Sequence, residues 1–139
     1  MKEGNLPVDG YFFPKQPLAI YAAGEQAKVP LLVGWNSEEG NWRNILGSDL
    51  PTKENLARAL REMDSEHADE ILKEYYAATD ADVETAATDL ASDRFIGFGT
   101  WRWSDFQAKT GVSRFYRYLY EQPRPDTRAP GKTTPPQGA

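Results

Sequence analysis

Residues 29–40 read Val-Pro-Leu-Leu-Val-Gly-Trp-Asn-Ser-Glu-Glu-Gly, and this stretch decides the fold. The run from Val29 to Trp35 is apolar throughout, and the turn formers Asn36 and Ser37 follow it directly. A short run that is apolar on both faces is typical of a strand in a parallel sheet that is covered on both sides. The stretch therefore predicts a buried strand of the parallel type over 29–35.

A second buried strand of this type is predicted over 113–121, where Ser-Arg-Phe-Tyr-Arg-Tyr-Leu-Tyr-Glu is rich in the aromatic residues that strands favour. Two strands joined by a long helical insertion indicate an α/β fold with a mostly parallel sheet. Because two strands are too few to make a stable sheet, we expect the remaining strands to lie outside these residues.

The insertion between the strands has the periodicity of helices, with apolar residues three and four positions apart. One helix is predicted behind an N-cap at Thr52, and a second behind Asp64 or Ser65. A third is predicted from Thr79 or Asp80 to Gly111, with interruptions at Gly97 and Gly99. A short helix over 16–25 and an extended loop over 6–15 precede the first strand, and the proline-rich residues 123–139 are predicted to be a loop or tail.

The composition excludes several classes of function. The chain has 16 Lys and Arg against 21 Asp and Glu and no basic run, which argues against nucleic acid as a partner. It has no cysteine, so it forms no disulfide, and its single histidine and scattered carboxylates predict no metal site and no cofactor. No apolar run approaches the roughly 20 residues of a membrane span, and no signal segment is recognisable, so the localisation stays open.

Two adjacent carboxylates, Glu38 and Glu39, come just after the strand predicted over 29–35. In open parallel sheets the functional groups gather beyond the carboxyl ends of the strands, so both are candidates for a catalytic role. The alternative is that one or both are solvated residues of a turn before Gly40. The residues alone leave both interpretations open.

Three segments of the chain resemble, in order and spacing, the type-B carboxylesterases, the family of the para-nitrobenzyl esterases and cholinesterases. They are Leu6-Pro-Val-Asp-Gly-Tyr-Phe-Phe-Pro14, Pro30-Leu-Leu-Val-Gly-Trp-Asn-Ser-Glu-Glu-Gly40 and Phe115-Tyr-Arg-Tyr-Leu-Tyr120. The resemblance implies part of an α/β-hydrolase fold and a serine esterase that cleaves small carboxylic esters through an acyl-serine intermediate. It also implies that Glu39 is the acid of a Ser-Glu-His triad, because the family's acid is the glutamate followed directly by glycine.

The other members of that triad are missing from the chain. No Gly-x-Ser-x-Gly motif occurs, and the glycine-rich oxyanion segment is absent as well. In the family the histidine follows a Gly-Ala-x-His motif, whereas this sequence ends Gln-Gly-Ala139. We therefore expect residues 1–139 to be a partial domain without the parts that carry the nucleophile and the histidine, and to be inactive alone. A partner for the chain would be the remainder of the hydrolase domain, on the same or another chain.

Two other groups of residues are candidates for sites. His67 lies too close in sequence to Asp64 and Ser65 to build a catalytic group with them, and it is expected at the surface. The rings around Trp101 have the spacing of helical core packing. The resemblance places this helix near the acyl side of the active-site gorge, which makes Phe95, Phe98 and Trp101 candidates for contact with substrate.

A function of another class is a stand-alone acidic helical module that binds protein and carries a disordered tail. It accounts for the helices over 52–110 and for the tail, and it makes Glu39 an ordinary turn residue. It does not explain a strand of the buried type without strand partners.

Overall fold

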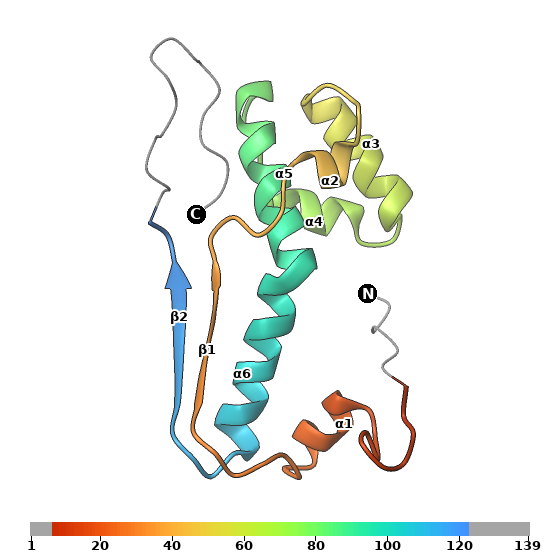
Figure 1. Ribbon diagram of the computed structural model, residues 1–139. Helices are drawn as coiled ribbons and strands as arrows, with labels where there is room; N and C mark the ends of the chain where they lie inside the picture. Colours follow the sequence, from red (N-terminus) through yellow and green to blue (C-terminus); the bar gives the residue numbers. More distant parts are fainter. Residues whose placement is uncertain (1–6, 123–139) are drawn as a thin grey trace. The chain divides into compact units, whose positions relative to one another are not determined.

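The computed structural model describes residues 7–122, which are shown as a ribbon in Figure 1. Residues 123–139, the predicted loop or tail, lie outside the described part of the chain. The described residues form two compact units, one of residues 7–34 and 100–118 and the other of residues 35–99 and 119–122. The elements are, in chain order, α1 (Pro17–Ala22), β1 (Leu31–Asn36), α2 (Arg43–Leu46), α3 (Lys53–Met63), α4 (Ala68–Glu74), the 3₁₀ helix η1 (Asp80–Asp82), α5 (Val83–Ser92), the π-helical turn η2 (Asp93–Gly97), α6 (Phe98–Thr110) and β2 (Phe115–Tyr120).

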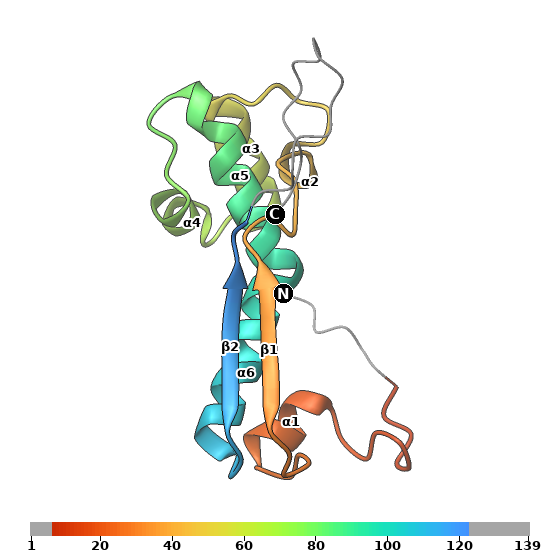
Figure 2. The same cartoon turned by 60° about the vertical axis from the view of Figure 1, so that its left-hand side comes forward.

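The strands β1 and β2 pair in parallel, and Figure 2 shows them side by side with their arrows in the same direction. The amide of Leu31 donates to the carbonyl oxygen of Arg114 at 3.1 Å, and six residues further on the amide of Ser37 donates to that of Tyr120 at 2.9 Å. This parallel pair, joined by helices, confirms the predicted mixture of strand and helix.

The prediction that both strands are buried is wrong for the described chain. In β1 Val33 is buried, whereas Leu32 is 72% exposed, and no residue of β2 is buried. Each strand has one neighbouring strand within residues 7–122, so its other edge and much of its apolar surface meet solvent.

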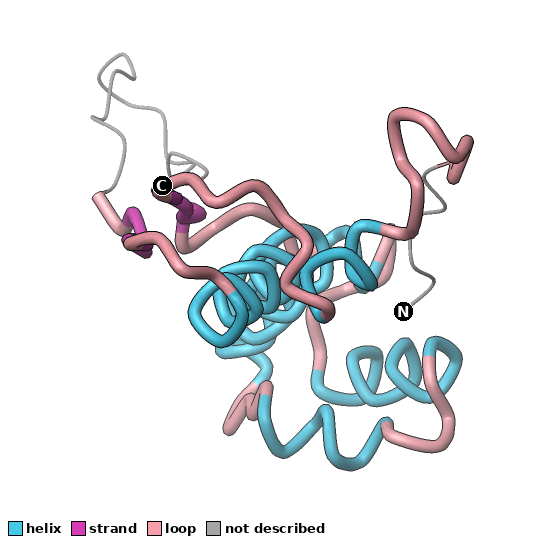
Figure 3. The backbone as a smooth tube through the Cα atoms, turned by 90° about the horizontal axis from the view of Figure 1, so that it is seen from below, coloured by secondary structure: helices cyan, strands magenta, loops and turns pink. Residues whose placement is uncertain are grey.

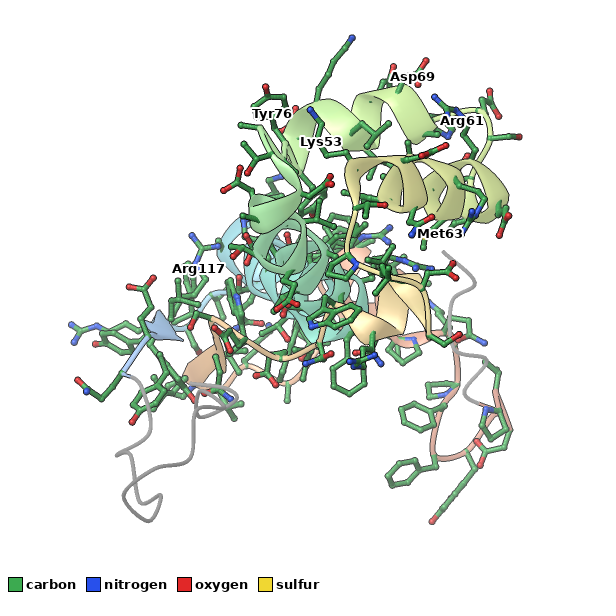
Figure 4. All side chains as sticks on the ribbon, turned by 90° about the horizontal axis from the view of Figure 1, so that it is seen from above. Lys53, Arg61, Met63, Asp69, Tyr76 and Arg117 are labelled. Carbon is green, nitrogen blue, oxygen red and sulfur yellow. The ribbon has the colours of Figure 1, made fainter. Side chains whose placement is uncertain are left out.

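The unit of residues 35–99 and 119–122 has a helical core of its own. α3 begins behind Thr52 as predicted, and the Thr52 hydroxyl accepts a hydrogen bond from the amide of Asn55 at 3.2 Å. At the surface, the Nη2 atom of Arg61 in α3 lies 3.9 Å from the Oδ1 atom of Asp69 in α4. Figure 4 shows these two side chains next to each other. The core consists of apolar residues at helical spacing, namely Leu46, Leu56, Leu60, Ala68, Ala77, Val83, Ala86, Ala87 and Leu90.

The structure differs from the predicted helices at two boundaries. α4 begins at Ala68 and not directly behind Asp64 or Ser65, because the Asp64 carboxylate accepts a hydrogen bond from the amide of His67 and stabilises a turn there. Gly97 and Gly99 do not interrupt the third helix. The π-helical turn η2 joins α5 to α6 without a loop, as the helical tube in Figure 3 shows. The short helix α2 was not predicted from the sequence.

The unit of residues 7–34 and 100–118 contains the short helix predicted over 16–25, here α1. It is followed by Gly24, whose φ of 69° lies in the left-handed region that glycine adopts readily. The hydroxyl of Thr110, at the end of α6, donates to the carbonyl oxygen of Tyr21 at 2.8 Å. The side-chain amide of Gln26 donates in turn to the Thr110 hydroxyl at 3.0 Å, so polar contacts connect α1 to α6 within this unit.

Candidate functional site

The turn after β1 carries Glu39, the predicted acid. Its side chain is partly buried, whereas that of Glu38 is exposed. The Oε1 atom of Glu39 accepts a hydrogen bond of 2.8 Å from the amide of Asn36, the last residue of β1. This bond folds the carboxylate back over the end of the strand. A carboxylate accepts up to about four hydrogen bonds, so this one leaves it able to bind the N–H of a histidine.

The backbone of the turn is held by a side chain from α5. The Oγ atom of Ser92 accepts hydrogen bonds from the amides of Glu39 and Gly40, at 3.0 and 2.9 Å. One helical turn earlier, the hydroxyl of Thr88 accepts from the amide of Trp42 at 3.1 Å. The residues after β1 are thereby attached to α5 at two successive levels.

The glycine after Glu39 is required by close contact with the same helix. A Cβ atom on Gly40 would lie 2.6 Å from the carbonyl carbon and 2.7 Å from the Cβ of Ala91. Real Cβ atoms do not approach other atoms so closely, so any larger residue would push the turn away from α5. This contact explains why a glycine follows Glu39, since a side chain at position 40 would collide with Ala91.

A pocket of about 750 Å³ lies in the unit that contains Glu39. Its walls combine carboxylates with aromatic rings, and it is lined by Trp35, Ser37, Glu74, Tyr75, Tyr76, Ala78, Asp82, Thr85, Ala86, Asp89, Ser92, Asp93 and Leu119. Burial raises the pKa of Asp89, and the nearby carboxylates of Asp93 and Glu38 raise it further. Burial also raises the pKa of Tyr75, whose hydroxyl donates to Asp93 at 2.8 Å. Four carboxylates line the pocket and give it a negative character, namely Glu74, Asp82, Asp89 and Asp93.

Sequence reasoning missed Ser92 and the acidic pocket. A signal was present, because the polar residues Thr88, Asp89 and Ser92 in α5, with Asp93 directly after it, interrupt the apolar pattern at helical spacing. Serine and threonine are neutral to unfavourable inside helices, because their hydroxyls compete for backbone groups. A partly buried Thr88 and a buried Ser92 four residues apart therefore suggest a contact with another segment. The segment that they contact is not readable from the pattern itself.

The three predicted substrate-contact residues are at the surface of the described chain. Phe95 is 74% exposed in η2, Phe98 is 41% exposed at the start of α6, and Trp101 is 43% exposed. The expectation that these rings pack in a core is therefore wrong for residues 7–122. Phe95 and Phe98 belong to the unit of Glu39, and Trp101 belongs to the other unit.

His67, the chain's single histidine, is exposed just before α4. Its Nδ1 atom lies 3.1 Å from both carboxylate oxygens of Asp64, and this contact lowers the pKa of Asp64. Within residues 7–122 no three His, Cys, Asp or Glu side chains are grouped so that they can hold a metal ion. None of the described helices is both long enough and apolar enough to cross a membrane.

Comparison with known proteins agrees with the resemblance noted in the sequence. The family model described as "Carboxylesterase family" matches residues 3–139. The match covers nearly the whole sequence, so the chain belongs to the carboxylesterase family, whose substrates are esters. None of the curated proteins compared with the chain matches it.

Proposed function

We propose that this chain supplies the acid of a Ser-Glu-His triad, Glu39, to a carboxylic ester hydrolase of the α/β-hydrolase fold. One observation carries the proposal. In a chain of the carboxylesterase family, a partly buried glutamate follows a strand of a parallel pair and is held at its carboxylate by Asn36 and at its backbone by Ser92. A turn that is fixed in this way suits a catalytic carboxylate, which must keep a defined orientation toward its histidine.

In the proposed reaction Glu39 accepts a hydrogen bond from Nδ1–H of a histidine. This bond sets the tautomer that leaves Nε2 free to take the proton of a serine hydroxyl as the serine attacks the ester carbonyl. The imidazolium that forms is stabilised by the carboxylate and then protonates the departing alcohol. Water, activated by the same histidine, hydrolyses the acyl-serine intermediate.

The serine and the histidine of this triad come from protein outside the 139 residues. The chain contains no Gly-x-Ser-x-Gly motif, and its single histidine, His67, is paired with Asp64 at the surface. The chain alone is accordingly a partial domain without ester hydrolase activity. Phe95, Phe98 and Trp101 are proposed as substrate contacts of the complete enzyme.

The alternative of a stand-alone helical binding module is less well supported. Membership of the carboxylesterase family gives it no support. The exposed apolar side chains of β1 and β2, such as Leu32 and Leu119, fit a sheet that continues in other protein better than they fit an independent module.

The first test is the coding sequence on both sides of the chain, which should encode Gly-x-Ser-x-Gly upstream and a histidine downstream. In the complete enzyme, Glu39→Gln should lower kcat for a chromogenic ester by about 10,000-fold, as loss of a triad acid does in serine hydrolases. Glu38→Gln is the matched control and should retain activity near that of the wild type.

Three results would contradict the proposal: flanking sequence without either motif, equal activity of the two variants, or hydrolysis by the purified 139-residue chain that Glu39→Gln abolishes.

A further inference from the structure

We propose that Ser92 is the positioning residue of the triad acid, and that its hydroxyl holds the Glu39 turn in the geometry that catalysis needs. This inference rests on the proposed role of Glu39. It concerns a residue on α5, 53 positions away in the sequence, that contacts Glu39 through the backbone.

The hydrogen bonds of Ser92 use the full capacity of its hydroxyl. A serine hydroxyl has one proton to donate and two lone pairs to accept with. The proton goes to the carbonyl oxygen of Thr88 at 2.8 Å, and the lone pairs take the amides of Glu39 and Gly40. Because all three directions are occupied, the position of Oγ is fixed by the helix, and the two amides are fixed by Oγ.

The same bonds exclude a nucleophilic role for Ser92. Its proton is directed to a main-chain oxygen and not to a base, and its side chain is buried, with 4% of the residue exposed. A nucleophilic serine needs a neighbouring base and access to substrate. The hydroxyl therefore acts by holding the backbone of the turn at Glu39 and Gly40.

Glu39 is held at both ends by different groups. Ser92 fixes its backbone amide, and the amide of Asn36 fixes its carboxylate. If the bonds to Ser92 are lost, Ser37 and Trp42 on either side of the turn stay bonded to Tyr120 and Thr88. The hydrogen bond that then holds Glu39 itself is the one between its carboxylate and the amide of Asn36, which is local to the turn. A shift of about 1 Å in a catalytic group lowers a rate by about 100-fold. The bond from the Glu39 amide to Ser92 is thus the hydrogen bond that connects Glu39 directly to α5.

The helix changes its geometry directly after Ser92. Ser92 is the last residue of α5, and the π-helical turn η2 begins at Asp93. Single π turns within α-helices are frequently found at functional sites. The change in helix type at this position is a second observation, independent of the hydrogen bonds, that associates the end of α5 with a functional site.

A first experiment measures the turn itself. Hydrogen exchange of the Glu39 and Gly40 amides is followed by NMR in the 139-residue chain for the wild type, Ser92→Ala and Ser104→Ala. Ser104 is the matched control, since it is also buried in a helix and its hydroxyl donates to a carbonyl of the same helix, that of Trp101. Exchange at both amides should become at least about tenfold faster in Ser92→Ala and should stay unchanged in Ser104→Ala.

A second experiment measures catalysis in the complete enzyme, with kcat expressed per active site from titration of the acyl-enzyme. Ser92→Ala should lower kcat by about 10- to 100-fold with little change in KM. It should also lower the pKa of the basic histidine in the pH–rate profile, because a displaced carboxylate stabilises the imidazolium less. Ser92→Thr keeps the hydroxyl and should restore most of the activity.

The outcomes separate the two proposals. If Glu39→Gln is inactive and Ser92→Ala keeps the kcat and pH profile of the wild type, the role of Ser92 is overturned and that of Glu39 stands. If Glu39→Gln is active, the triad assignment itself fails. If Ser92→Ala does not fold, Ser92→Cys replaces it, since its sulfur is a weaker acceptor, and an unchanged exchange rate and pH profile in that variant would equally overturn the role of Ser92.

Discussion

Gly40 and Ala91 are in backbone contact, because a Cβ atom on Gly40 would lie 2.6 Å from the carbonyl carbon of Ala91. The candidate acid, Glu39, is the residue before this glycine and is attached to Ser92, the residue after this alanine. The place of the acid is therefore set by a helix that comes about fifty positions later in the sequence. The only side chain at this contact is the methyl group of Ala91, so small changes in either segment are transmitted to the other.

Gly40→Ala should destabilise the chain by about 1 to 3 kcal/mol, because a methyl group forced into a close contact moves the backbone. Urea unfolding followed by circular dichroism measures the change. Gly99→Ala is the control, since nothing outside its own helix lies within 4 Å of a Cβ at that position. It should stabilise α6 by about 0.5 to 1 kcal/mol, and a loss as large as that of Gly40→Ala would contradict the contact argument.

Leu60→Ala should lower the free energy of unfolding by about 2 to 5 kcal/mol, since Leu60 is fully buried in the helical core and its truncation leaves a cavity. Leu50 is 73% exposed, so Leu50→Ala, the same chemical change, should cost less than about 0.5 kcal/mol. The two losses of unfolding free energy are compared from the denaturant midpoints of the variants, provided that their m-values are equal. Equal costs would mean that the core over α2 to α5 is not formed in solution.

Asp89→Asn should stabilise the chain at neutral pH. Burial and the charges of Asp93 and Glu38 raise the pKa of Asp89 above 3.8, so ionised Asp89 costs stability in the folded state. The gain from Asn is complete above the raised pKa, shrinks as the pH falls through it, and vanishes below 3.8, where Asp89 is protonated in both states. Unfolding of both proteins from pH 3.5 to 7 measures this trend. A gain that grows toward acid pH would refute the assigned direction.

Phe98→Ala and Trp101→Ala, tested one at a time in the complete enzyme, should change the ratio of kcat/KM between a bulky and a short acyl ester by about tenfold or more. Loss of an aromatic wall alters how well acyl groups of different size are held. The control is Phe12→Ala, which removes a ring that is 75% exposed in the N-terminal loop. If each variant keeps the selectivity of the control, the proposed substrate contact is wrong.

Much of the fold was predictable because its signals are local. The strand at 31–36 and the helices behind Thr52 and Thr79 follow from apolar spacing and capping residues within a few positions of each element. The burial of the strands was not predictable. An apolar strand is buried only where other strands and helices cover it, and residues 7–122 contain no third strand.

The amino-acid sequence by itself determined the family, the order of strand and helix, and the position of Glu39 beside Gly40 at the end of a strand. Only the tertiary structure decided which residues hold that glutamate and why a glycine follows it. Ser92 and Ala91 are far from Glu39 along the chain, and the contact depends on the path that brings α5 against the turn. Periodicity describes which face of an element is apolar, and the element that meets this face is settled by the packing of the whole unit.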